Sequence, residues 1–303
     1  MKTKIVGALA ICLAATLWGL DGVVLTPHLY NLKVGLVVFL LHAIPFVLLS
    51  LFFSNQLKYL KRFSWGDIIS FSLVAICGGA LGTIAIVKAL FLVHFEHLSI
   101  VILLQKLQPV FAITLAAILL GEKLSLKFLF WALVAILASY LLTFGLTLPH
   151  FNTGNNTNLA AMWALLAAFC FGSATVFGKK VLAKYSFQTC TYFRFGFTTL
   201  IMLAYVLYTG DLLGLRNVTP FNWTIFLIIA VTTGSGAIFI YYYGLKRVRA
   251  MTATICELAF PVSAITFDHI FHGASLTWLQ WLAASLIILA IIKITQQQTK
   301  LVA

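Results

Sequence analysis

Two carboxylates, Glu257 and Asp268, lie in a segment that is otherwise almost entirely apolar. They are eleven residues apart, and at about 100° per residue this spacing returns to nearly the same side of an α-helix. Pro261 lies between them on that side and removes the backbone donor that would bond to the carbonyl of Glu257. Because ionisable groups in apolar segments normally face a cavity or a partner, the stripe predicts a path that binds substrate or protons. Hydrogen bonds between packed helices are the alternative.

A second polar cluster contains one cation between two amides. Gln105 and Gln108 lie one helical turn apart, with Lys106 between them. A buried lysine loses its proton or pairs with an anion, so we expect Lys106 to pair with Asp21 or Glu257. A carboxylate that exchanges Lys106 for substrate or a proton would couple transport to a gradient, whereas a permanent ion pair would be structural.

Three further ionisable residues interrupt apolar segments. Lys88 lies near the end of its segment, where its long side chain either reaches the membrane interface or contacts substrate. Arg194 is eight residues into its segment, and a snorkelling position with a gating or structural role is favoured over substrate binding. His42 precedes Pro45, and helix packing is favoured over a role in translocation.

Aromatic residues flank the acidic positions. Trp18 lies one turn before Asp21, and Tyr241 and Tyr242 belong to a run of three tyrosines. Aromatic rings beside an acid can bind an organic cation or an amine. The residues predicted along the substrate path are Trp18, Asp21, His42, Lys88, Gln105, Lys106, Gln108, Tyr241, Tyr242 and Glu257.

The composition determines what kind of elements must position these residues. Of 303 residues, 62% are hydrophobic and 9% are charged, and the mean hydropathy is +1.05. Soluble domains carry about 25% charged residues, so a soluble enzyme and a disordered chain are excluded. Segments of about 20 apolar residues are long enough to be transmembrane helices and too long for barrel strands. Ten are predicted, at 5–25, 34–53, 67–92, 97–120, 125–146, 158–183, 187–208, 222–245, 250–271 and 276–294.

The formal net charge of +13 is distributed unevenly between the connections. With the N-terminus inside, 15 of the 20 Lys and Arg lie inside, 2 lie outside and 3 lie within segments. Cytoplasmic loops carry such an excess of basic residues. This predicts a multi-pass protein of the cell (inner) membrane with both termini cytoplasmic. Nucleic-acid binding is not predicted, because it would need the basic residues gathered on one folded face.

The two halves of the chain repeat each other. Shifted by 152 residues, 103–140 overlays 255–292 with twelve identical residues in 38 positions, including Pro109 with Pro261. Each half holds five predicted helices, so the second half enters the membrane with opposite topology. Inverted repeats build a substrate site near the midplane that opens to either side in turn. The sequence therefore predicts an all-α integral membrane protein, a transporter with ten transmembrane helices in two inverted five-helix repeats.

Short motifs in both halves identify a family. In the first half they are Lys88-Ala-Leu, Leu-Leu-Gln-Lys-Leu-Gln-Pro109-Val-Phe and Leu-Leu-Gly121-Glu122-Lys-Leu-Ser. In the second half they are Tyr243-Gly-Leu-Lys-Arg, Glu257-Leu-Ala-Phe-Pro261 and Gly273-Ala-Ser-Leu. Together they resemble the EamA domain of the drug/metabolite transporter superfamily. The chain departs from the family pattern in both halves. Ala274 stands where Glu is usual in the second half, and His42-Ala43 stands where an Arg-Phe pair is expected in the first.

The resemblance implies a secondary transporter of small organic molecules, with the first, third, fourth, sixth, eighth and ninth helices around a central cavity. The predicted domains are a first repeat at 1–146, an external linker at 147–157 and a second repeat at 158–303. Gating or structural roles are predicted for Arg194, Pro109, Pro261, Glu122 and Asp268.

The substrate class stays open between two alternatives. Buried groups of both signs favour an amino acid or similar zwitterion, moved by alternating access, with proton coupling as a hypothesis. An organic-cation or drug exporter is favoured if Asp21, Glu257 and the tyrosines form a cage while Lys106 points away. An enzyme is not predicted, because the chain lacks nucleophile, zinc-peptidase and P-loop motifs.

Neither a cofactor nor a metal is predicted. His94-x-x-His97 and Asp268-His269-x-x-His272 have spacings that could share a metal, but no third protein ligand is fixed by sequence. The predicted partners are a small-molecule substrate and membrane lipid, and the predicted assembly is a monomer or a homodimer.

Overall fold

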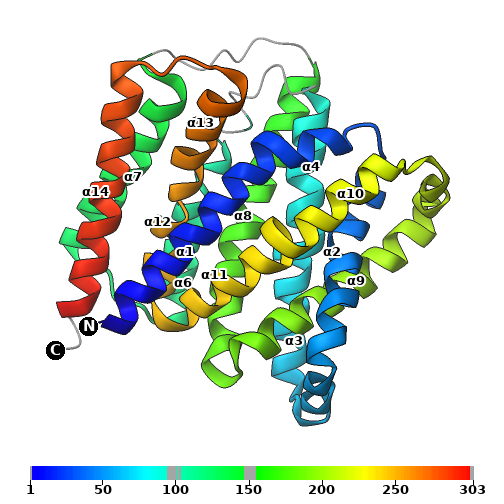
Figure 1. The fold of residues 1–303 in the computed structure, drawn as a ribbon. Helices are drawn as coiled ribbons and strands as arrows, with labels where there is room; N and C mark the ends of the chain where they lie inside the picture. The colour runs from blue at the N-terminus through cyan, green and yellow to red at the C-terminus, as the bar shows by residue number, and fades with distance from the viewer. Residues whose placement is uncertain (1, 94–100, 102–103, 147–154, 301–303) are drawn as a thin grey trace.

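The computed structural model describes residues 2–93, 101, 104–146 and 155–300, and all regular elements in these ranges are helical. The helices form one bundle, with the two chain termini at the same end (Figure 1). Nine runs of helix in the described ranges are long and apolar enough to cross a membrane, and a tenth apolar helix, α6 (Gln108–Leu120), is shorter. The prediction of an all-α membrane protein is confirmed.

Several spans are single helices whose bounds lie within a few residues of the predicted segments. They are α2 (Val34–Phe53), α7 (Leu126–Phe144), α8 (Asn155–Lys184), α9 (Phe187–Thr209) and α14 (Trp278–Lys300). The predicted segment 97–120 and linker 147–157 fall partly outside the described residues, as do His94 and His97.

Other spans change helical geometry on the way. A π-helical stretch interrupts three of them: η1 (Asp21–Leu25) follows α1 (Lys2–Leu20), η4 (Ala75–Leu81) joins α3 (Trp65–Val74) to α4 (Gly82–Leu92), and η6 (Ala230–Gly234) joins α10 (Pro220–Ile229) to α11 (Ser235–Arg247). Short 3₁₀ segments are η2 (Thr26–Leu29), η3 (Ser54–Arg62) and η5 (Asp211–Asn217). Such π-helical stretches occur frequently at functional sites.

The ninth span breaks where its carboxylate lies. Helix α12 (Ala250–Cys256) ends before Glu257, and α13 (Ala259–His272) begins two residues later. As the sequence indicates, Pro261 cannot donate the usual helical hydrogen bond to the carbonyl of Glu257, but the carbonyl is not left without a donor. The backbone N–H of Phe260 donates to that carbonyl at 2.9 Å, so a tighter turn satisfies the acceptor.

Side-chain caps mark several helix starts. Ser125, Ser186 and Thr219 precede α7, α9 and α10, and each side-chain oxygen accepts a backbone N–H of the first turn. Such caps satisfy donors that have no partner within the helix. Polar residues at the ends of apolar runs therefore fix where these spans begin.

Two close helix contacts cross between the halves of the chain. Helix α1 packs on α13 at Gly19, where an added Cβ would lie 2.9 Å from the backbone nitrogen of Ala264. Helix α8 packs on α6 at Gly172, where an added Cβ would lie 3.0 Å from the backbone nitrogen of Ala112. Helices α7 and α14 pair at one side of the bundle (Figure 1). The two glycine contacts bring four helices together around the break at Glu257.

Candidate functional site

The side chain of Glu257 is the centre of a polar cluster. Tyr241 donates its hydroxyl to Oε1 at 2.7 Å, and Thr175 donates to the same oxygen at 3.3 Å. The amide Nε2 of Gln108 donates to Oε2 at 2.5 Å. Thr175 and Tyr241 also share a hydrogen bond of 2.9 Å. Both carboxylate oxygens are therefore held by neutral donors.

Each member of the cluster comes from a different element. Gln108 begins α6, Thr175 lies in α8, Tyr241 lies in α11, and Glu257 lies in the break between α12 and α13. Trp18 in α1 adds an aromatic face, since its ring centroid is 5.3 Å from that of Tyr241. These elements belong to the first, fourth, sixth, eighth and ninth spans, five of the six that the resemblance places around a central cavity.

No cation pairs with Glu257 in the described part of the chain. The four ion pairs found there involve other residues. A membrane carboxylate that accepts only neutral hydrogen bonds can exchange one of these donors for a substrate donor, a cation or a proton. The cluster is therefore suited to reversible binding.

The expected ion pair of Lys106 with Asp21 or Glu257 is wrong. Its ammonium group donates to the carbonyl of Ser139 at 3.3 Å and to the hydroxyl of Thr143, both in α7. The side chain is 9% exposed. Lys106 lies in the turn that precedes α6, its side chain reaches α7, and oxygen acceptors on α7 replace the expected anion. Gln105 is partly exposed beside it.

Asp21 forms a separate polar contact. Its Oδ1 accepts from Thr233 at 3.1 Å and its Oδ2 accepts from Thr26 at 3.1 Å. Because Asp21 begins η1 and Thr233 lies in η6, the contact joins two π-helical stretches. Asp21 shares no described hydrogen bond with Glu257, so the two acids do not form one hydrogen-bonded cage.

Arg194 is buried rather than extended to the interface, which corrects the expected snorkelling position. Its Nη2 donates to the carbonyl of Gly78 in η4 at 2.7 Å, and its Nη1 donates to the hydroxyl of Tyr242 at 3.4 Å. The guanidinium also lies 5.6 Å from the ring centroid of Tyr242. A backbone carbonyl of a π-helical stretch and a tyrosine hydroxyl therefore hold the two terminal nitrogens of the guanidinium, while its buried Nε has no hydrogen-bond partner among the described residues.

His42 and Lys88 lie apart from the Glu257 cluster. The Nδ1 of His42 is 2.8 Å from the carbonyl of Val38 in the same helix, and its ring packs on Phe195. The exposed side chain of Lys88 stacks over Trp163, with its ammonium 4.6 Å from the ring centroid. Both arrangements fit the packing and snorkelling alternatives.

Of the residues predicted for gating or structure, Glu122 and Asp268 lie near helix ends, whereas the two prolines lie beside the break at Glu257. Glu122 accepts backbone N–H groups at the start of α12. Asp268 pairs with His272 at 2.8 Å near the end of α13, where both side chains are exposed. Pro109 and Pro261 each occupy the first turn of a helix, α6 and α13.

Sequence reasoning missed two threonines that complete the polar contacts. Thr175 binds Glu257, and Thr233 binds Asp21. Thr175 follows Gly172 by three residues, and Thr233 directly precedes Gly234; the repeat aligns these glycines with Gly19 and Gly82. A search for hydroxyl residues within one turn of these glycines would have found both.

Known proteins resemble the chain in sequence and fold. The riboflavin transporter ImpX of Fusobacterium nucleatum subsp. nucleatum is 50% identical over 297 residues, which cover 98% of this chain and 99% of that protein. A solved protein crystal structure aligns over 100% of this chain and 99% of its own, with a TM-score of 0.69 and 16% identity, which shows a shared fold. The model of the EamA-like transporter family matches residues 5–144 and again residues 158–296. With both halves matched, the chain belongs to the EamA-like transporter family and is a transporter rather than an enzyme.

Proposed function

We propose that this transporter carries riboflavin or a closely related flavin. The similarity to a riboflavin transporter extends over almost the full length of both chains. The single structural observation in support is the Glu257 cluster, which combines a carboxylate and a carboxamide with the aromatic rings of Trp18 and Tyr241. Flavins are planar aromatic molecules with a polar edge, so they match this combination of groups.

The hydrogen-bonding groups of a flavin complement those of the cluster. One edge of the ring system carries an N–H donor between two carbonyl acceptors, and the ribityl chain carries hydroxyl donors. Glu257 offers acceptors, and the carboxamide of Gln108 offers both a donor and an acceptor. Trp18 and Tyr241 supply faces on which a planar ring can stack. Binding would exchange the donors that now hold Glu257 for donors of the substrate.

An amino acid or similar zwitterion has less support from this geometry. The sequence favours it because buried groups of both signs would meet at one site. Lys106 instead donates to α7, and the described donors to Glu257 are neutral. An organic cation is the second candidate, because Glu257 lacks a cationic partner in the described residues and lies next to Tyr241 and Trp18.

We further propose that Glu257 exchanges a proton during transport. Its three neutral donors can stabilise a carboxylate, and no described ion pair fixes its charge. Protonation would remove the charge before the emptied site reorients across the membrane. Uptake driven by an imposed pH gradient in wild type, and insensitive to that gradient in Glu257→Gln, is the expected signature.

The orientation and assembly in the membrane stay proposals as well. The distribution of 15 basic residues inside against 2 outside supports cytoplasmic termini in the cell membrane and an external linker at 147–157. A reporter fused after Ala303, which is active only in the cytoplasm, tests this orientation. Monomer or homodimer is decided by the mass of the detergent-solubilised protein.

Uptake into proteoliposomes tests the proposed substrate. Purified protein is reconstituted, and uptake of radiolabelled riboflavin is measured with and without an excess of unlabelled riboflavin, an amino-acid mixture or a tetraalkylammonium ion. We expect competition by riboflavin alone. Competition by the ammonium ion with no riboflavin uptake would favour the organic-cation reading, and uptake of amino acids would favour the zwitterion.

A further inference from the structure

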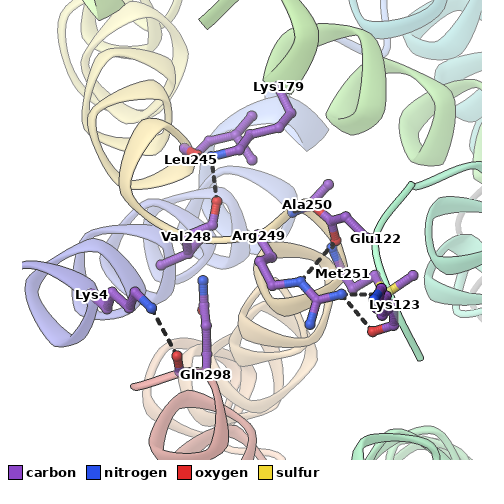
Figure 2. Close-up of polar contacts among 10 residues, drawn as sticks. All are labelled: Lys4, Glu122, Lys123, Lys179, Leu245, Val248, Arg249, Ala250, Met251 and Gln298. Atoms are coloured by element: carbon purple, nitrogen blue, oxygen red, sulfur yellow. Dashed lines mark hydrogen bonds and ion pairs between the residues drawn. The ribbon is translucent and has the colours of Figure 1, made fainter. Parts of the chain in front are cut away.

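The start of α12 is held by a carboxylate from the other half of the chain. Oε1 of Glu122 accepts the backbone N–H of Ala250 at 2.8 Å, and its Oε2 accepts that of Met251 at 3.0 Å (Figure 2). Arg249 adds an ion pair, with its Nε 3.6 Å from Oε2 of Glu122, and donates to the carbonyl of Lys123 at 2.6 Å. We call Glu122, Arg249, Ala250 and Met251 the latch.

The latch lies at the end of the bundle that carries the chain termini, here called the basic end. Lys179 donates to the carbonyls of Leu245 at 2.8 Å and Val248 at 2.5 Å, at the end of α11. Lys4 donates to the carbonyl of Gln298 at 2.8 Å (Figure 2). The connection between α11 and α12 is therefore held at both ends, by Lys179 from its own half and by Glu122 from the first half.

The latch and the substrate cluster occupy the two ends of one short helix. All seven residues of α12 are buried, from Ala250 to Cys256, and Glu257 follows directly. Helix α13 on the other side of the break has only Pro261 and Ser263 buried. The half of the ninth span nearer the basic end is therefore enclosed by protein, whereas the other half is only partly enclosed.

The carboxylate of the latch has no equivalent at the matching position of the second repeat. Helices α6 and α13 end alike at Gly121 and Gly273, with φ angles of +64° and +70°. The next residue is Glu122 in the first repeat and Ala274 in the second. Ala274 has no carboxylate to offer, and its backbone carbonyl lies 2.6 Å from Nδ1 of His269. The repeat therefore supplies equivalent turns of which only the first is followed by a carboxylate, and positions 98 and 99, equivalent to Ala250 and Met251, lie outside the described residues.

We propose that Glu122 is a positioning residue that closes the basic end of the substrate path. By binding the first N–H groups of α12 it fixes the helix that presents Glu257, and the path opens toward the basic end only when Glu122 releases them. The inference rests on the proposed use of Glu257 in transport but not on the identity of the substrate. The free N–H groups of α12 meet water in the open state.

Reversible crosslinking across the latch tests the proposal. In a background without the five native cysteines, Glu122→Cys and Ala250→Cys are combined, and riboflavin uptake is measured before oxidation, after it and after reduction. The matched control joins Lys179→Cys to Val248→Cys, a contact within the second repeat. We expect oxidation to abolish uptake in the first pair, reduction to restore it, and the control pair to transport throughout.

The outcomes distinguish failure of the latch proposal from failure of the proposed substrate. Undiminished uptake by the crosslinked first pair would overturn the proposal, and a block in both pairs would assign the effect to the connection between α11 and α12 rather than to Glu122. Failure of the proposed function alone would appear as absent riboflavin uptake by the wild-type protein.

A second measurement needs no substrate. Hydrogen exchange of the Ala250 and Met251 amides is compared in wild type, Glu122→Gln and Arg249→Gln. Glu122→Gln retains only one carbonyl acceptor, so we expect at least tenfold faster exchange there, whereas Arg249→Gln leaves both backbone contacts and changes exchange less. Equal exchange in all three proteins would contradict the role given to Glu122.

Discussion

The two repeats build the same turn and use it differently. Gly121 and Gly273 end equivalent helices with left-handed backbone angles, and Glu122 or Ala274 follows. In the first repeat the carboxylate accepts the first backbone N–H groups of α12, whereas Ala274 has no carboxylate to offer. The duplicated fold therefore supplies equivalent turns, and one side chain distinguishes them.

A second pair of equivalent positions shows the same divergence. His42 and Arg194 are 152 residues apart, the spacing of the repeat. His42 bonds to a carbonyl of its own helix, whereas Arg194 reaches the carbonyl of Gly78 in η4. Arg194 therefore connects two spans by a hydrogen bond, whereas the hydrogen bond of His42 stays within its own helix.

The largest expected effect is on riboflavin uptake, and it should differ between variants of the two carboxylates of the ninth span. Glu257→Gln removes the charged acceptor of the central cluster, and hydrogen bonds to charged groups contribute about 1.5–3 kcal/mol, so we expect riboflavin uptake to fall about 10- to 100-fold. Asp268→Asn is the matched control on the same helix face. Its exposed ion pair contributes about 0–1 kcal/mol, and uptake should be unchanged. Equal losses in the two variants would remove the distinction.

An intermediate effect, on the stability of the folded protein, should differ between variants of Arg194 and His42. Arg194→Leu leaves the carbonyl of Gly78 without its charged donor, and we expect a loss of about 2 kcal/mol in stability. His42→Leu loses a contact within one helix and should cost about 1 kcal/mol or less. Thermal unfolding in detergent should show the lower midpoint for Arg194→Leu. The reverse order would contradict the cross-span role.

The smallest expected effect compares the two glycines. An added Cβ has nothing within 4 Å at Gly121 or at Gly273, so each alanine variant carries mainly the left-handed backbone penalty of about 1–2 kcal/mol. Similar losses of stability are expected. Only Gly121→Ala should also speed hydrogen exchange at Ala250, because it displaces Glu122. Faster exchange there in Gly273→Ala would argue against a one-ended latch.

Most of the fold could be predicted because the lengths of apolar runs define spans. The segment 34–53 coincides with α2, and the other described spans differ from their segments by a few residues. The π-helical stretches could not be predicted, since they depend on contacts such as that of Arg194 with Gly78. Pro261 indicates the break at Glu257, but nothing in the sequence indicates that the backbone N–H of Phe260 donates to the Glu257 carbonyl.

The candidate site could be predicted only in part. Depth along a helix follows from the sequence, and it placed Asp21 and Glu257 at depths comparable to that of Lys106. The direction of a side chain around its helix depends on the neighbouring helix, and Lys106 therefore found acceptors on α7 that no spacing reveals. Thr175 was missed because a hydroxyl in an apolar run has no charge to mark it.

Riboflavin binding to the purified protein tests the central claim most directly. Flavin fluorescence is titrated with wild type, Glu257→Gln and Glu122→Gln, under conditions where no transport occurs. The Glu257 cluster predicts saturable binding to wild type and to Glu122→Gln, and affinity at least tenfold weaker for Glu257→Gln. Equal affinity of wild type and Glu257→Gln would contradict the assignment of the substrate site.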